Sequence, residues 1–281
     1  MTDLTLDQAK GMSLGLAVGD ALGTTLEFSS RDSLPPVTDI VGGGPFNLEP
    51  GVWTDDTSMA LCLGESLVQC QGWRADDCAL RFVRWRDEGY MSPTGDCFDI
   101  GNTVSAALDR FVRDGDPYSG STDPNSSGNG GIMRLAPAVI ANHSDVRSAV
   151  DVAVMQSQIT HASDECDDFA FALSAFLHSA NLRDALHRID TATPREQVKS
   201  SGYVRDSYEA AFWCFENTAS FRDCIVLAAN LGGDADTVAA IAGQIAGRVY
   251  GMEGIPAEWL EILAWREKIE TMAVDLYALG S

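Results

Sequence analysis

The chain has few basic residues. Its 281 residues include 19 Lys and Arg against 41 Asp and Glu, which gives a formal net charge of −22 at neutral pH. A surface this acidic repels DNA, RNA and anionic membranes, so we expect no direct binding to nucleic acid or membranes. The same acidity also fits plain solubility or a salt-rich habitat. A phosphorylated ligand would have to be held by backbone N–H groups, a metal ion or a few local cations.

Paired cysteine motifs and long apolar runs are also missing. The chain has seven cysteines, an odd number, and none of them forms a C-x-x-C pair. This pattern argues against a disulfide framework or a zinc knuckle and favours a reducing compartment. No apolar stretch reaches the length of a membrane span, and no basic segment followed by an apolar one opens the chain. Cytoplasm is the expected compartment.

Strand signals are scarce, and only residues 37–41 have the pattern of a short strand. Apolar periodicity instead predicts helices near residues 58–70, 75–88, 102–113, 145–157, 166–180, 203–216 and 257–279, with a further helix start at Thr193-Pro194. No internal repeat and no linker divides the sequence. We therefore predict an all-α fold in which residues 1–281 form a single compact helical domain.

A row of glycines runs along the first predicted helix, at Gly11, Gly15, Gly19 and Gly23. Residues four apart are neighbours on a helix surface, and an exposed glycine costs about 1 kcal/mol relative to alanine. The row makes sense where another helix packs directly against its backbone. Glu27 continues the same spacing and is predicted to point toward that partner. The G-x-S-x-G pattern in this helix has no preceding strand, so we interpret it as chance.

Two acidic motifs lie far apart, Trp-Thr-Asp-Asp-Thr at 53–57 and Gly-Gly-Asp-Ala-Asp-Thr at 232–237, and each opens an apolar helical pattern. Helix capping explains one aspartate per helix but not the matched pairs. Four carboxylates within bonding distance would repel each other unless a cation neutralised them. Oxygen-only ligand sets suit Mg²⁺ or Mn²⁺ better than Zn²⁺. The sequence therefore predicts a cleft that binds metal between the two motifs.

Two further segments carry candidate chemistry. The glycine-rich stretch at 126–134 offers consecutive N–H groups that can cradle a phosphate, although a flexible surface loop fits it equally well. It is not a P-loop, since no Gly-Lys-Ser/Thr follows. In the stretch at 97–103, Asp99 is either a reacting carboxylate or the N-cap of the next helix.

Together with Gly19–Gly23 and Thr160-His161, these motifs resemble the ADP-ribosylglycohydrolases, the family that includes the bacterial dinitrogenase-reductase-activating glycohydrolases. The resemblance spans nearly the whole chain, with the motifs in the same order. It implies an all-helical fold with a dinuclear metal cleft that holds two Mg²⁺ or Mn²⁺ ions. The metal ligands that it implies are Thr54, Asp55, Asp56, Asp234, Asp236 and Thr237.

The resemblance also implies roles for other residues. The catalytic residues would be Asp99, Glu27 and the metal ligand Asp56. The substrate-binding residues would be Gly101, Asn102, Gly128, Asn129, Gly130, Gly131, Met133 and His161. Many members have a serine where this chain has Gly131, so a side-chain hydrogen bond to phosphate is absent here. A structural role for His161 is an equal alternative, and helix packing is favoured for Tyr250, which resembles an aromatic near the nucleotide.

The implied function is metal-dependent hydrolysis of the glycosidic bond between ADP-ribose and a modified side chain, with arginine favoured. The substrate would be an ADP-ribosylated protein or small molecule, and free ADP-ribose the product. Other ADP-ribose linkages (serine, nucleobase, O-acetyl-ADP-ribose) are alternatives within the family. Outside it, a two-metal phosphohydrolase or a non-catalytic ADP-ribose-binding protein would use the same residues.

Overall fold

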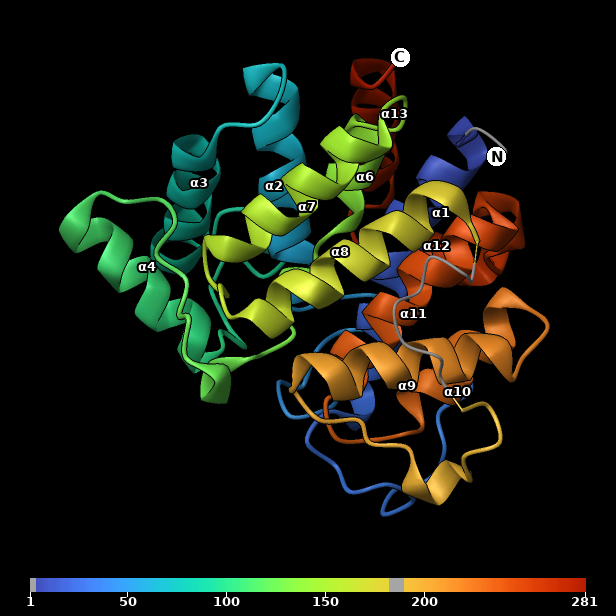
Figure 1. Ribbon diagram of the computed structural model, residues 1–281. Coiled ribbons are helices and arrows are strands. Elements are labelled where there is room, and N and C mark those ends of the chain that lie inside the picture. Colours follow the sequence, from blue (N-terminus) through green and yellow to red (C-terminus); the bar gives the residue numbers. More distant parts are fainter. Residues whose placement is uncertain (1–3, 182–189) are drawn as a thin grey trace.

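Helices form nearly all of the regular structure in the computed structural model, which describes residues 4–181 and 190–281 (Figure 1). The α-helices are α1 (Leu6–Gly23), α2 (Asp55–Cys70), α3 (Ala75–Glu88), α4 (Asn102–Asp114), α5 (Gly130–Met133), α6 (Ala136–Ala141), α7 (Val146–Gln158), α8 (Asp164–Ser179), α9 (Val204–Glu216), α10 (Phe221–Ala229), α11 (Ala235–Tyr250), α12 (Ala257–Ile262) and α13 (Arg266–Leu279). The short 3-10 turns are η1 (Thr24–Leu26), η2 (Pro124–Ser126), η4 (Arg195–Gln197) and η5 (Met252–Gly254). Within the two described segments no β-strand occurs, so the predicted all-α fold class is confirmed.

The short strand-like pattern at residues 37–41 does not form a strand. The Val37 N–H donates to Asn230 Oδ1 at 3.0 Å, and the Val37 carbonyl accepts from Asn230 Nδ2 at 2.7 Å. One side chain thus takes both polar groups that a neighbouring strand would otherwise bind. Since the two residues lie 193 positions apart, no local pattern could reveal this pairing.

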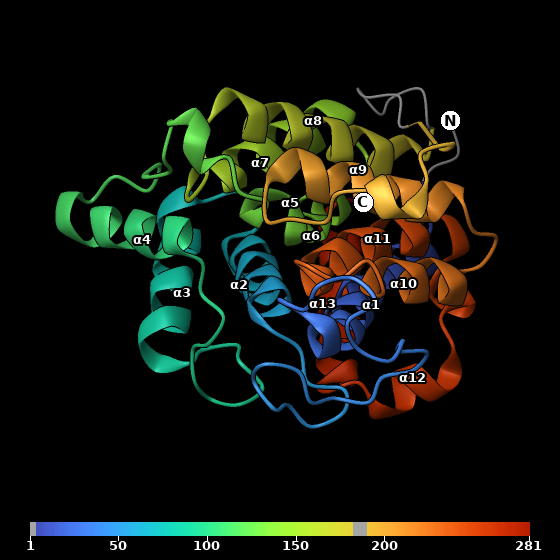
Figure 2. The same cartoon turned by 90° about the horizontal axis from the view of Figure 1, so that it is seen from below.

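The glycine row of α1 packs against the backbone of α11. A Cβ placed on Gly19 would lie 2.0 Å from the Ala239 carbonyl oxygen, and one on Gly243 would lie 2.0 Å from that of Gly15. Main-chain atoms cannot rotate away as a side chain can, so only glycine permits this approach. The predicted backbone contact is confirmed, and its partner is the second helix rich in small residues. Figure 2 shows the pair at the centre of the molecule.

Most predicted helix positions are confirmed, with three corrections. The last predicted helix, 257–279, is two helices, because Trp265 adopts a left-handed backbone conformation (φ 54°) between α12 and α13. The start predicted at Thr193-Pro194 gives only the 3-10 turn η4. Helix α10 has no counterpart among the predictions, although Ser220 caps it by accepting from the Asp223 N–H at 3.1 Å. A serine three residues before an aspartate is a capping signal that could have found this helix.

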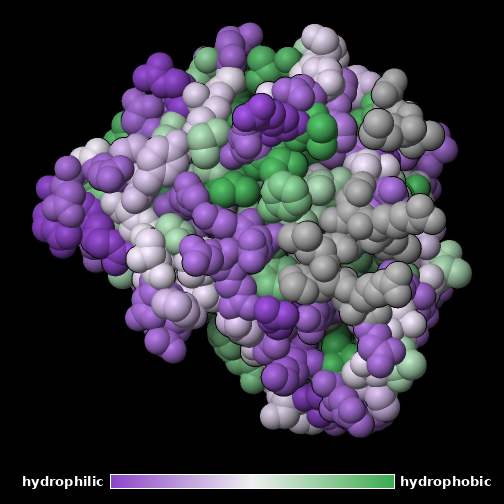
Figure 3. All heavy atoms as spheres, viewed as in Figure 1, coloured by the Kyte–Doolittle hydropathy of each residue, from purple (hydrophilic) through white to green (hydrophobic). Residues whose placement is uncertain are grey.

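Hydrophilic side chains cover most of the face shown in Figure 3, including the protruding end of the molecule where Figure 1 places α4. In the part of the chain that the structure describes, no helix combines the length and the apolar character needed to cross a membrane.

Candidate metal centre and ligand cleft

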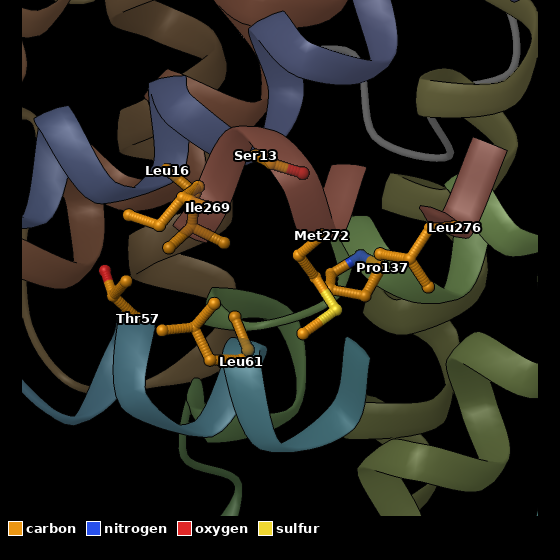
Figure 4. Close-up of a pocket in the computed structure, with 9 residues that line it drawn as sticks. Ser13, Leu16, Thr57, Leu61, Pro137, Ile269, Met272 and Leu276 are labelled. Carbon is orange, nitrogen blue, oxygen red and sulfur yellow. The ribbon is translucent and has the colours of Figure 1, made fainter. Parts of the chain in front are cut away.

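The structure contains a small apolar cavity that is not the functional site. This cavity, of about 20 Å³, lies between α1, α2, α6 and α13, and no carboxylate or histidine lines it (Figure 4). Ser13, the serine of the G-x-S-x-G pattern, lies here inside α1, and its buried hydroxyl has no hydrogen-bond partner among the described residues. A nucleophile elbow requires a strand before the serine and a base beside it. The pattern is therefore chance, as the sequence indicated.

A larger hollow, which we call the acidic cleft, has a volume of about 310 Å³. Its lining residues are Glu27, Phe28, Asp55, Asp99, Ile100, Gly101, Asn102, Thr103, Val104, Gly128, Asn129, Gly130, Met133, His161, Gly202, Asp234 and Thr237. Twelve of these are predicted site residues; Phe28, Ile100, Thr103, Val104 and Gly202 are not. The cleft thus brings together candidate residues from segments that lie far apart in the sequence.

The two acidic motifs begin the helices that meet beneath this cleft. Helix α2 starts at Asp55 and α11 at Ala235, as predicted for both motifs. Thr54 Oγ1 lies 3.2 Å from Asp236 Oδ2 and shares its one proton between Asp236 and Asp20, and Thr237 Oγ1 donates to Asp56 Oδ1 at 3.2 Å. Each motif therefore uses its threonine to contact a carboxylate of the other motif.

Asp20 also lies in the cluster formed by these carboxylates, and the sequence analysis gave it no role. It is completely buried in α1 and accepts hydrogen bonds from the backbone N–H and hydroxyl of both Thr54 and Thr57, at 2.6–3.0 Å. Burial is the main cause that raises the Asp20 pKa, to about 6. A carboxylate held at the first turn of α2 fixes how that helix approaches α1. The signal was available, since Asp20 is the one carboxylate inside the glycine-row stretch 11–23.

The carboxylates form three groups, and within each group one oxygen atom from every member lies within 4.8 Å of the others. The groups are Asp20, Asp56 and Asp236; Glu27, Asp234 and Asp236; and Asp55, Asp99 and Asp236. Asp236 belongs to all three, so it is the centre of the cluster. Burial, followed by repulsion from neighbouring carboxylates, raises the pKa of Asp55, Asp56 and Asp236 well above the ordinary value.

The donor set of this cluster fits a hard divalent cation. Glu27 Oε2, Asp56 Oδ2 and Asp236 Oδ1 are buried, and none has a hydrogen-bond partner among the described residues. Buried polar atoms are nearly always paired, so three orphaned carboxylate oxygens in one cluster require an explanation. Coordination of a metal supplies it, because Mg²⁺ and Mn²⁺ prefer oxygen ligands. These acidic residues could therefore hold metal ions.

Glu27 and Asp99 face the cleft from the side of η1 and α4. Asp99 is not the N-cap of α4, since that position belongs to Gly101, and Asp99 itself adopts φ 59°. Backbone strain of this kind is frequent at functional sites. Burial is the main cause that raises the Asp99 pKa to about 7 and the Glu27 pKa to about 12. Nearby carboxylates raise the Glu27 pKa further, whereas for Asp99 hydrogen bonding with Glu27 and Asp236 opposes the rise. The alternative of a simple cap is excluded for Asp99.

The glycine-rich loop closes over His161. A Cβ on Gly130 would lie 2.5 Å from the His161 ring, so the loop packs on the imidazole without any side chain between them. Asn129 donates from Nδ2 both to Ser207 Oγ at 2.8 Å and to Asp234, which ties the loop to the second acidic motif. Gly131 faces away from the cleft, and a Cβ there would lie 2.0 Å from Ser157 Oγ. A serine at position 131 would not fit unless Ser157 moved.

Aromatic rings stand at the mouth of the cleft. Phe28 is 67% exposed, adopts φ 57° and donates its N–H to the Gly233 carbonyl at 2.7 Å. Its ring meets Phe46 edge-on at 6.4 Å, and Phe46 contacts Phe98 at 5.2 Å. A large apolar ring held in solvent by a rare backbone conformation indicates a binding surface.

Comparison with known proteins gives a consistent result. A family model described as ADP-ribosylglycohydrolase matches residues 1–281. Two relatives are named ADP-ribosylarginine hydrolase Tri1: the one from Pseudomonas putida is 44% identical over 97% of this chain and 78% of its own, and the one from Serratia proteamaculans is 43% identical over 98% and 80%. The ADP-ribosyl-[dinitrogen reductase] glycohydrolase of Rhodospirillum rubrum is 33% identical over 92% of this chain and 90% of its own.

A solved structure described as an ADP-ribosylglycohydrolase-related protein complex has the same fold. It superimposes with a TM-score of 0.86 and 36% sequence identity, and the match covers 98% of this chain and 99% of that one. The likeness therefore extends over nearly the whole molecule.

Proposed function

The chain belongs to the ADP-ribosylglycohydrolase family, and from this premise we propose that it hydrolyses ADP-ribosylarginine and so reverses ADP-ribosylation of proteins. The ADP-ribosylated protein or small molecule would be the substrate, and free ADP-ribose the product. The observation that carries the proposal is the carboxylate cluster beneath the acidic cleft, with three orphaned oxygens and Asp236 in each of its groups. Neither a phosphate-binding module nor a structural protein needs such a cluster.

We propose that two Mg²⁺ or Mn²⁺ ions bind this cluster. Their ligands would be Thr54, Asp55, Asp56, Asp234, Asp236 and Thr237. Because Asp236 belongs to every group of oxygens, it would help to hold both ions. When bound, the ions would supply Lewis acidity and an activated water.

The protein groups around the cluster support the remaining chemistry. Asp99 and Glu27 face the cleft, and the Asp99 pKa of about 7 is expected of a carboxyl group that exchanges a proton near neutral pH. Burial beside other carboxylates raises the Glu27 pKa further, so the free protein holds a proton on Glu27. Asp56 lies buried in the cluster and would orient the reacting groups. At the other end, the loop of Gly128, Asn129 and Gly130 would hold the pyrophosphate through its backbone.

Three observations favour arginine as the linkage. Two relatives that match nearly the whole chain at 43–44% identity are named for this substrate. The guanidinium group is a flat cation, and the cleft that would receive it is lined by four carboxylates, Glu27, Asp55, Asp99 and Asp234. The exposed ring of Phe28 offers an aromatic face at its mouth, where a guanidinium can stack.

The same proposal covers the domain organisation, the cellular compartment and the binding partners of the protein. Residues 1–281 act as a single domain, since α1 near the start packs along α11 near the end. All seven cysteines are free, which suits the reducing cytoplasm. The acidic surface argues against direct binding to nucleic acid or membranes.

The proposal is tested with a panel of defined substrates that carry ADP-ribose on arginine, serine, a nucleobase or an acetyl group. Each is incubated with Mg²⁺, with Mn²⁺ and with chelator, and free ADP-ribose is measured. We expect release from the arginine linkage that depends on the metal and stops with chelator. Release from serine but not arginine would overturn the linkage, and undiminished release in chelator would overturn the metal requirement.

A further inference from the structure

A buried arginine lies beneath the glycine-rich loop, outside every role assigned so far. Arg134 is completely buried, and its guanidinium lies over the Phe82 ring at 4.7 Å from the centroid. Burial lowers its pKa to about 10, so the side chain remains charged at neutral pH. A buried charge is costly unless hydrogen bonds compensate for it. The hydrogen bonds of Arg134 therefore indicate what it supports.

The hydrogen bonds of Arg134 reach Gln156, which contacts the glycine-rich loop, and Thr160, which contacts His161. Arg134 Nε donates to Gln156 Oε1 at 2.9 Å, and Nη2 donates to the Gln156 carbonyl at 3.1 Å and to Thr160 Oγ1 at 2.8 Å. Gln156 Nε2 in turn donates to the carbonyl of Gly131. One side chain thus braces the glycine-rich loop and the residue that precedes His161.

The donor and acceptor roles in these hydrogen bonds determine where the hydroxyl proton of Thr160 points. Arginine can only donate, so Thr160 Oγ1 is the acceptor of the first bond. Thr160 Oγ1 lies 2.9 Å from His161 Nδ1, and within the described residues the hydroxyl contacts no other acceptor. Its single proton therefore points to Nδ1. A neutral imidazole that accepts at Nδ1 carries its own proton on Nε2.

We propose that Arg134 and Thr160 are positioning residues that hold His161 as the Nε2–H tautomer, a neutral donor directed at the ligand. His161 lines the acidic cleft, and its Nε2 would lie 2.9 Å from a Cβ on Gly128, the first residue of the loop. Among the described residues Nε2 has no hydrogen-bond partner, so this donor is available to a phosphate oxygen. Burial and the charge of Arg134 lower the His161 pKa to about 3, which keeps the ring neutral.

That the ligand is the pyrophosphate of ADP-ribose rests on the proposed function. The tautomer of His161 follows from the hydrogen bonds alone and does not depend on that function. The test uses protein labelled with ¹⁵N-histidine, whose long-range ¹H–¹⁵N correlations distinguish the two tautomers. Thr160→Val removes the hydroxyl at nearly equal volume, and Thr160→Ser keeps it as the matched control. We expect Nε2–H in the wild type and in T160S. In T160V the tautomer should no longer be fixed, and calorimetric affinity for ADP-ribose should fall by about tenfold.

Two results would overturn the inference: a wild-type His161 protonated on Nδ1, or a T160V variant with unchanged tautomer and affinity. A wild type that does not bind ADP-ribose contradicts the proposed function instead, while the spectrum of the protein without ligand still decides the tautomer. Should T160V not fold, His161→Gln, which keeps a donor, should bind ADP-ribose more tightly than His161→Phe. Equal affinities of those two variants would also contradict the inference.

Discussion

Along the contact between α1 and α11, the end that contains Gly11 and Gly247 brings two main chains together with no side chain between them. At the other end the same two helices carry Asp20 and Asp236, and Glu27 follows α1, so buried carboxylates crowd one interface. The main chains are equally close at the second end, where a Cβ on Gly23 would lie 2.4 Å from the Ala235 carbonyl oxygen, but only this end adds orphaned oxygens and raised pKa values. Rigid packing at one end can hold repelling groups in place at the other, as strained functional sites require.

This contrast predicts opposite effects of substitution at the two ends. A side chain added to the glycine contact should destabilise the fold directly. Neutralising one of the proposed metal-binding carboxylates should leave the protein as stable as before, or more so, while it removes metal binding and activity.

The largest effect is expected for Gly243→Leu. Its Cβ would lie 2.0 Å from the Gly15 carbonyl oxygen and 2.5 Å from the carbonyl carbon, and no rotamer relieves a clash at Cβ. We expect a loss of more than about 4 kcal/mol, enough to prevent folding, as circular dichroism melts would measure. Gly202→Ala is the control, because its Cβ would meet only the Asp234 side chain, with Oδ2 nearest at 3.4 Å. A well-folded G243L protein with the wild-type melting temperature would contradict the packing argument.

Asp236→Asn should abolish activity and the effect of Mn²⁺ on stability. Wild-type protein should gain about 2.7 kcal/mol at a Mn²⁺ concentration one hundred times Kd, whereas D236N should gain almost nothing. In chelator the variant should melt at or above the wild-type temperature, since a buried carboxyl group with an orphaned oxygen and repelling neighbours is gone. Asp151→Asn, at an exposed position, should keep the full Mn²⁺ shift. If D236N still responds to Mn²⁺, Asp236 is not a ligand.

Glu27→Gln and Asp99→Asn should separate chemistry from binding. We expect both variants to bind Mn²⁺ and ADP-ribose, while turnover falls by roughly 10²-fold, the usual scale for loss of a positioned acid or base. The loss should appear in kcat and kcat/KM together, because the missing interaction belongs to the chemical step. Near-normal turnover with a lowered melting temperature would instead assign the residue a structural role.

His161 should give a smaller, pH-dependent effect on stability. Its pKa is lowered from 6.5 to about 3 in the folded protein, mainly by burial, so between these values the unfolded chain binds a proton that the native protein does not. The stability present above pH 6.5 is therefore lost as the pH falls toward 3, at up to about 1.36 kcal/mol per pH unit. Urea melts from pH 7 to 4 should show a shallower decline for His161→Gln than for wild type. His143→Gln, which alters a histidine stacked on Tyr277, is the control and should decline as wild type does.

Local pattern was sufficient for the features that depend on helix periodicity and on motif chemistry. The glycine row, the two acidic helix starts and the all-α class could all be predicted, because spacing along one helix determines which side chains share a face. The carboxylate cluster could be anticipated only because the motifs match each other.

The features that could not be predicted from the sequence depend on contacts between distant segments. Asn230 pairs with Val37, and Asp20 with Thr57, through hydrogen bonds that no local window contains. The orientation of Gly131 toward Ser157 likewise follows from how α5 packs on α7. Phe28 could not be recognised as exposed, since an isolated phenylalanine in a sequence normally indicates core.

The smallest effect should come from Tyr250→Phe, at the end of α11 far from the cluster. Tyr250 is the last residue of α11, whereas Asp236 is in its first turn, so the two lie roughly 20 Å apart along the axis. The Tyr250 ring contacts Phe215 at 6.2 Å and does not line the acidic cleft. Packing on the helix face, the favoured interpretation of this residue, therefore predicts that kcat/KM for ADP-ribosylarginine stays within about twofold and stability within about 0.5 kcal/mol of wild type. Parallel assays of Y250F and wild type over a range of substrate concentrations would measure both parameters. A rise in KM by tenfold would mean that the nucleotide reaches this end of the helix pair, and the division between a packed end and a reactive end would then be wrong.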